Sequence, residues 1–159
     1  MKITFIIIAF LFVAFIVGFF ILGFISKSGE PSGLIEGRLA KCPNKPNCVC
    51  SEYTEDANHY IEPISIAQDI TFDALPILKN IIRELGGNIQ TESDHYLAAT
   101  FTSAIFGFVD DLEISIDATQ KIVHIRSASR VGNGDGGVNK KRTELLKERY
   151  NKNISEARH

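Results

Sequence analysis

The residues with the clearest chemical potential lie between Arg126 and Arg142, where the sequence reads Arg-Ser-Ala-Ser-Arg-Val-Gly-Asn-Gly-Asp-Gly-Gly-Val-Asn-Lys-Lys-Arg. A glycine-rich loop there joins a strand pattern to a basic helix pattern. Successive glycines can present backbone N–H groups, and a following helix adds the positive end of its dipole, so the segment predicts a cradle for an anion with Arg130 among the supporting charges. The alternative is a common glycine turn, with Asp135 or Asn139 near the helix start and solvated arginines.

The loop differs from the two common phosphate-binding motifs. Gly132 and Gly137 have the separation of a nucleotide P-loop, but Val138-Asn139 replaces the Lys and Ser/Thr that hold phosphate and magnesium. No parallel βαβ unit surrounds the loop, which excludes a dinucleotide fingerprint. We therefore expect no nucleotide and no other cofactor.

Catalytic groups are present near the loop but do not form a complete set. Ser127 and Ser129 are possible nucleophiles, yet strand alternation points the nearest base, His124, away from both. Asp110 and Asp111 resemble an acid/base pair, but adjacent residues of a strand face opposite sides of a sheet. No catalytic residue is therefore assigned.

Two strands, 109–116 and 122–129, carry most of these residues and are predicted to pair as a hairpin. Antiparallel partners share a face, so the apolar sets of the two strands must oppose each other, which fixes the register. The predicted opposite pairs are Ile116 and Val123, Ile114 and Ile125, Leu112 and Ser127, Glu113 and Arg126, Asp111 and Ala128, and Asp110 and Ser129. Glu113 and Arg126 then form a cross-strand ion pair, while Asp110 lies on the core side and needs a partner.

Arg142 is the natural candidate for that partner. On a helix that starts at Val138, it shares a side with Leu145 and Leu146 and so interrupts the face meant for the sheet. A cation in that position should meet a carboxylate, either Asp110 or Asp111. Such a pair could also serve structure alone, by locking the last helix to the sheet.

The remaining patterns complete an α+β domain. They predict a strand over 59–64, a helix over 73–85 that ends at Gly86-Gly87, and strands over 88–92 and 95–103. The order strand, helix, four antiparallel strands, helix predicts one layer of helices packed on one face of the sheet. The apolar link 104–107 is expected to cover the edge of the core or, less commonly, to lie exposed near a membrane.

An apolar segment precedes the domain. From Phe5 to Ile25 there are 21 consecutive residues without a polar side chain, about the length that crosses a ~30 Å hydrocarbon layer as a helix. A cleaved signal peptide is the alternative, but its apolar core is usually ~7 to 15 residues and ends in small residues. We expect a transmembrane anchor over 1–25 that contacts the membrane through 3–25, a linker over 26–38, a domain over 39–152 and a tail over 153–159.

The side of the membrane is predicted from two opposing signals. The basic residues after the span, Lys27, Arg38, Lys41 and Lys45, argue for a cytoplasmic domain. Two cysteines in a short Pro/Asn-rich segment argue for an oxidising compartment. Because long domains translocate largely regardless of charge, we expect the domain to be extracytoplasmic.

The three cysteines, at 42, 48 and 50, allow one disulfide and one free thiol. Cys42 is predicted to pair with Cys48 across a tight turn of prolines and asparagines, which leaves Cys50 free, and a Cys42–Cys50 bond is the alternative. The spacing lacks the paired Cys-x2-Cys units of a zinc site, and only His59 is nearby, so no metal site is expected.

Several of these motifs together resemble the domain-of-unknown-function family 1499. They are Cys-Pro-x-x-Pro-Asn-Cys-Val at 42–49, Asp-Asp-x-Glu at 110–113, and Arg-Ser-Ala-Ser-Arg-Val-Gly at 126–132, followed by Asp135, Gly137-Val-Asn139 and Arg142. The resemblance spans residue 39 to about residue 150. It implies a bacterial or plastid protein, often secreted or membrane-attached, and it supplies no reaction. The sequence departs from the family at Cys50, usually serine, and at Asn133-Gly134, where an aromatic residue and a serine are common.

The sequence as a whole predicts a membrane-anchored binding or scaffold module with a basic glycine-loop pocket for an anion. Its partner would be an anionic envelope component or another membrane protein, and the net charge of −2 gives no footprint for nucleic acid. The alternative is a hydrolase or transferase of the cell envelope centred on Asp110, Ser127 and Arg126. The candidate binding residues are Asp110, Asp111, Glu113, Arg126, Ser127, Ser129, Arg130, Asp135, Asn139 and Arg142.

Overall fold

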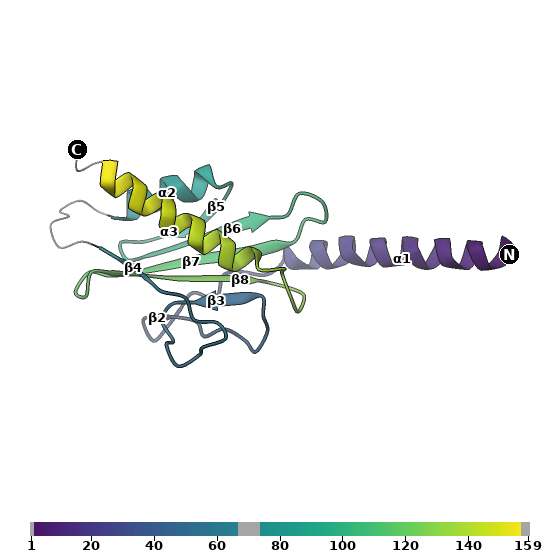
Figure 1. Cartoon of the computed structure of the whole chain (residues 1–159), viewed down its shortest axis with the longest axis horizontal. Helices are drawn as coiled ribbons and strands as arrows, with labels where there is room; N and C mark the ends of the chain where they lie inside the picture. Colours follow the sequence, from purple (N-terminus) through teal and green to yellow (C-terminus); the bar gives the residue numbers. More distant parts are fainter. Residues whose placement is uncertain (1, 67–73, 157–159) are drawn as a thin grey trace.

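A long apolar helix projects from an α+β domain in the computed structural model, which describes residues 2–66 and 74–156 (Figure 1). Helix α1 runs from Lys2 to Ser26, and its apolar side chains are exposed. At 1.5 Å per residue its 25 residues span about 37 Å. The helix is therefore long and apolar enough to cross a membrane.

One antiparallel sheet forms the body of the domain. Its strands lie side by side in the order β3, β8, β7, β6, β5, and β4 pairs with the other end of β8. The bounds are β3 Cys48–Cys50, β4 Ile64–Ser65, β5 Asn88–Glu92, β6 Tyr96–Thr102, β7 Val109–Asp117 and β8 Ile122–Ser129. All six predicted pairs between β7 and β8 are confirmed.

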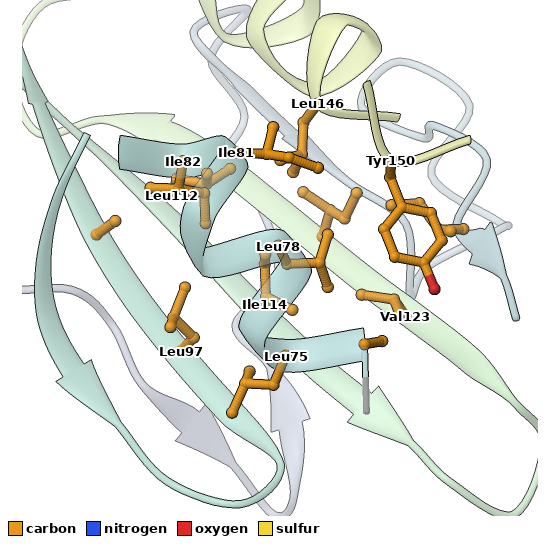
Figure 2. Close-up of a cluster of buried hydrophobic side chains, with 14 of the residues drawn as sticks. Leu75, Leu78, Ile81, Ile82, Leu97, Leu112, Ile114, Val123, Leu146 and Tyr150 are labelled. Atoms are coloured by element: carbon orange, nitrogen blue, oxygen red, sulfur yellow. The ribbon is translucent and has the colours of Figure 1, made fainter. Parts of the chain in front are cut away.

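Two helices cover one face of this sheet, as predicted. Helix α2, Ala74–Glu84, and helix α3, Val138–Glu156, pack on it (Figure 1). Figure 2 shows the resulting core, in which the helix residues Leu78, Leu146 and Tyr150 meet Leu112 and Ile114 of β7. Burial of such side chains, each worth about 1.5–3 kcal/mol, is the main force that holds the layers together.

The ends of the helices follow local signals. Gly86 adopts a φ of 88°, which glycine tolerates, and Gly87 N–H donates to the Ile82 carbonyl to close α2. Asp73, the predicted first residue of α2, lies outside the described residues. Helix α3 continues past residue 152 to Glu156, where Ile154 packs into the core, and residues 157–159 lie outside the described part.

The predicted strand over 59–64 is wrong in its bounds. Tyr60 makes one isolated bridge with Cys50, and regular pairing begins only at Ile64, in β4. The N–H groups of His59 and Tyr60 donate to the Asp56 carbonyl in a turn. Pro63 has no N–H to offer to a ladder, so pairing resumes after it.

The second face of the sheet is partly covered by a short hairpin. Strands β1, Leu34–Ile35, and β2, Arg38–Leu39, form a hairpin that the sequence did not predict. Leu39 is fully buried in a cluster with Tyr96 and Ala128 of the sheet. Within the segment predicted as a linker, the Gly33 N–H donates to Glu113 of β7, so part of that segment also packs on the domain.

The cysteines pair as favoured. Cys42 and Cys48 form a disulfide, and Cys50 is a buried free thiol in β3 whose pKa is raised by its burial. The disulfide loop leads directly into β3, which pairs with β8 at Ser127 and its neighbours. The bond therefore fixes the edge of the sheet nearest to the candidate site.

Replacing both Cys42 and Cys48 by serine is expected to lower the free energy of unfolding by about 2 kcal/mol, since a short loop restricts the unfolded chain only modestly. Urea unfolding of the full chain in detergent micelles, followed by far-UV circular dichroism, would measure the change. Cys50→Ala, which leaves the disulfide intact, is the control for loss of a buried sulfur. A double variant as stable as the wild type would contradict the expectation.

Candidate functional site

Three of the four acidic residues of β7 each pair with one of the predicted arginines. The pairs are Asp110 Oδ2 with Arg142 Nη2 at 2.8 Å, Asp111 Oδ1 with Arg130 Nη2 at 2.7 Å, and Glu113 Oε2 with Arg126 Nη1 at 2.6 Å. The arginine side chains are only 7–11% exposed. They are therefore neither solvated nor available as free positive charges.

The pairs lie on both faces of the sheet because side chains alternate along β7. Asp110 faces the helix layer, where Arg142 also stacks over the Phe101 ring at 4.4 Å. Asp111 and Glu113 belong to the second face. Of the two partners expected for Arg142, the structure selects Asp110.

Asn139 is the centre of the polar cluster on the helix side. Its Oδ1 accepts hydrogen bonds from Ser127 Oγ and Arg142 Nη1, both at 2.6 Å. Its Nδ2 donates toward Ser129 Oγ at 2.9 Å and the Asn47 carbonyl at 3.1 Å. Asn139 is 1% exposed, so the amide ties the start of α3 to β8 and to the disulfide loop.

Asp135 fills the predicted anion cradle. Its carboxylate accepts hydrogen bonds from the backbone N–H of Gly137 at 2.9 Å and of Asn139 at 2.7 Å, and from Asn139 Nδ2 at 2.8 Å. These are the donors that a helix start offers to an anion. The protein's own side chain therefore takes the place that the sequence assigns to a ligand.

Glu113 anchors a separate network on the second face. Its Oε1 accepts hydrogen bonds from Tyr96 Oη at 2.8 Å and from the Gly33 N–H at 2.7 Å. Burial, followed by the charge of Glu113, raises the pKa of Tyr96 far above its ordinary value. Arg126 Nε is buried and has no hydrogen-bond partner among the residues that the structure describes.

The histidine considered as a base does not approach the candidate serines. His124 Nδ1 lies 3.3 Å from Ser51 Oγ, and the pairing of His124 with Ser115 puts it on the face opposite Ser127. Within residues 2–66 and 74–156, no group of three or more His, Cys, Asp or Glu could hold a metal ion. Ser127 Oγ and Ser129 Oγ are instead hydrogen-bonded to the side chain of Asn139.

The residues of this site lie within a stretch that matches a known protein family. The family model described as "Protein of unknown function (DUF1499)" matches residues 38–149, which is most of the chain. The chain belongs to this family. No curated protein and no solved structure matches it.

A hollow of about 340 Å³ opens where the DUF1499 domain meets α1. Phe19 and Leu22 of α1 and Phe108 are among its apolar lining residues, and residues 131–135 of the glycine loop also line it. Asp110 and Ser129 are also among the lining residues. None of the described residues that line the hollow is basic.

Sequence reasoning missed two parts of this site. The first is Asn47, whose side chain donates to the carbonyls of Val131 and Gly132 and so holds the glycine loop of the DUF1499 domain. The motif that contains Asn47 was interpreted as a tight turn between cysteines and as a family motif, without a role in the site. The second is the contribution of α1, for which a sequence pattern gives no signal because the contact joins segments far apart in the chain.

Proposed function

We propose that the protein is a single-pass membrane protein whose domain binds an amphiphile from the bilayer, without catalysis. The observation that carries the proposal is the hollow between α1 and the glycine loop. Two of its lining residues, Phe19 and Leu22, belong to the apolar helix that would lie in the membrane. A ligand that enters from the lipid layer would meet apolar side chains first and polar ones beyond them.

The polar lining supports a ligand end that donates hydrogen bonds. Asp110 and Asp135 supply carboxylate oxygens, and Ser129 supplies a hydroxyl. Asp110 Oδ2 already accepts from Arg142, and Asp135 already accepts from the start of α3. A neutral hydroxyl or an amine fits this lining better than a phosphate, which the two carboxylates would repel.

The anion-accepting pocket predicted from the sequence is therefore the less favoured form of the proposal. Its N–H donors are bonded to Asp135, and its arginines are paired with β7 carboxylates. An anionic envelope component would have to displace these internal partners. The hydrolase or transferase alternative is disfavoured because Ser127 Oγ is hydrogen-bonded to Asn139 and Arg142, and Ser129 Oγ to Asn139, rather than to a base.

We further propose that the domain is extracytoplasmic. The Cys42–Cys48 disulfide supports this side of the membrane, since such bonds persist in oxidising compartments. The hydroxyl- or amine-bearing amphiphiles of an outer leaflet would then be the accessible ligands.

Thermal unfolding of the full chain in detergent micelles tests the ligand class. We expect monooleoylglycerol to raise the unfolding midpoint, by about 5 to 10 °C at 100 times its Kd. Oleoyl lysophosphatidic acid, which has the same acyl chain and an anionic head, should have a smaller effect. Val138→Trp is designed to obstruct the hollow, because Val138 lines it and is 48% exposed.

The control variant is Lys140→Trp, which adds the same indole to the exposed side of α3. Monooleoylglycerol should stabilise Lys140→Trp as it does the wild type, and it should not stabilise Val138→Trp. If lysophosphatidic acid is the stronger stabiliser, the anionic ligand class is correct instead. If neither lipid shifts the wild-type midpoint, the binding proposal fails.

A further inference from the structure

The turn between β6 and β7, residues 103–108, is unusual for a loop of a soluble domain. It reads Ser-Ala-Ile-Phe-Gly-Phe and contains no charged residue. Ile105 at its tip is 73% exposed, although isoleucine is normally buried. Neither hydrophobic core of the domain includes Ile105, Phe106 or Phe108.

Aromatic contacts attach this turn to α1. The Phe106 ring lies 5.1 Å from the Phe19 ring and 5.2 Å from the Phe20 ring, measured between centroids. The Phe108 ring lies 6.2 Å from that of Phe19 in an edge-to-face arrangement. The expectation that the link over 104–107 covers the edge of the core is therefore wrong, because the link packs on the apolar helix instead.

The end of α1 is also held by polar contacts and by close approach. Ser26 Oγ accepts the Val109 N–H at 3.0 Å, and Arg130 Nη1 donates to the Ser26 carbonyl at 3.3 Å. A Cβ at Gly23 would lie 1.8 Å from the Phe106 carbonyl oxygen, so only glycine allows this contact. The helix and the domain thus form a fixed joint at Ser26.

The position of Phe19 determines the depth of the turn. Phe19 lies seven residues before the end of α1, about 10 Å along the axis. The apolar segment continues from Phe19 through Ile25, so a span that places α1 in a bilayer places Phe19 within the hydrocarbon layer. Phe106, which contacts Phe19, must then lie at the same level.

We propose that the β6–β7 turn inserts into the bilayer beside α1, as a second membrane contact. This inference rests on the membrane anchor of the proposed function and is independent of its ligand. The partner is the lipid of the leaflet from which α1 emerges, since Ile105 is exposed and the neighbouring Phe106 packs on α1. Figure 1 shows the turn at the end of the sheet from which α1 projects.

The backbone of the turn suits an apolar surrounding. Gly107 N–H donates to the Ser103 carbonyl, Ser103 N–H to the Phe108 carbonyl, and Phe108 N–H to Ser103 Oγ at 2.9 Å. Internal bonding of this kind reduces the cost of placing backbone polar groups in lipid. Two membrane contacts also fix the tilt of the domain, which keeps its α1-side hollow at the lipid surface.

A single tryptophan can report the depth of the turn, because the chain contains none. The experiment uses the full chain in phosphatidylcholine vesicles, with and without bromine atoms on the acyl chains. Ile105→Trp reports the tip, and Phe12→Trp, at an exposed position of α1, reports the bilayer core. Gln120→Trp, in the exposed β7–β8 turn at the other end of the hairpin, is the matched control.

We expect brominated lipid to quench Ile105→Trp to a degree comparable with Phe12→Trp and to leave Gln120→Trp unchanged. If Phe12→Trp is quenched and Ile105→Trp behaves like Gln120→Trp, the turn lies outside the bilayer and the inference is overturned while the anchor stands. If neither is quenched, the anchor and the inserted turn both fail. Failure of monooleoylglycerol to bind would overturn only the proposed ligand.

Discussion

Replacement of Glu113 by alanine is expected to lower the free energy of unfolding by about 3–5 kcal/mol, because it leaves the Arg126 guanidinium buried without its counter-charge. Glu113 is fully buried, and the Arg126 side chain is 7% exposed. The same change also removes the acceptor of Tyr96 Oη and of the Gly33 N–H. Arg126 Nε already lacks a partner among the described residues, so the guanidinium has little compensation available.

Urea unfolding of the full chain in detergent micelles, followed by far-UV circular dichroism, would measure this loss. Glu92→Ala is the matched control, since it removes the partner of Lys79 in an exposed ion pair and should cost less than about 1 kcal/mol. Adding Arg126→Met to Glu113→Leu should recover most of the stability, because an apolar pair needs no counter-charge. Equal losses from Glu113→Ala and Glu92→Ala would show that burial of the pair is energetically unimportant.

The arrangement of this pair followed from the sequence because it depends on alternation alone. Two apolar patterns of period two must align so that their apolar sets share a face, and the short connection between the strands limits the remaining shifts. The resulting register places Glu113 opposite Arg126 and Asp110 next to the helix layer. The interruption of an apolar helix face by Arg142 predicted a carboxylate partner, Asp110 or Asp111, and the structure shows that it is Asp110. Short-range periodicity thus determined the central hairpin and two of the three ion pairs, one on each face of the sheet.

Other features depend on contacts that no local pattern encodes. Each strand of the β1–β2 hairpin is only two residues long. Its one buried strand residue, Leu39, packs on the second face of the sheet. The glycine loop predicted an open cradle because glycines can present free backbone N–H groups. In the structure, the N–H groups of Gly137 and Asn139 donate to Asp135, which lies within the same loop. The docking of α1 depends on the close approach of Gly23 to Phe106, about 80 residues later in the chain. The apolar character of the segment predicted a membrane anchor but gave no sign of this contact.

Replacement of Asn139 by alanine is expected to lower the free energy of unfolding by about 3 kcal/mol, because several buried polar groups lose their partner at once. Ser127 Oγ and Arg142 Nη1 lose an acceptor, and the Asn47 carbonyl and Ser129 Oγ lose a donor. Asn133→Ala, an exposed change in the same loop, is the control and should alter stability by less than about 0.5 kcal/mol.

The Asn139 variant also separates a structural cluster from a binding site. Amide hydrogen exchange over residues 131–137 should accelerate in Asn139→Ala, because Asp135 loses the Asn139 Nδ2 contact and the loop loses its tie to β8. That loop forms one wall of the hollow, so monooleoylglycerol should bind Asn139→Ala more weakly and slow its exchange less than in the wild type. Faster exchange with unchanged lipid binding would mean that the cluster only locks α3 to the sheet. Unchanged exchange would contradict the hydrogen-bond pattern on which the whole site depends, since Asn139 joins the glycine loop, β8 and the disulfide loop.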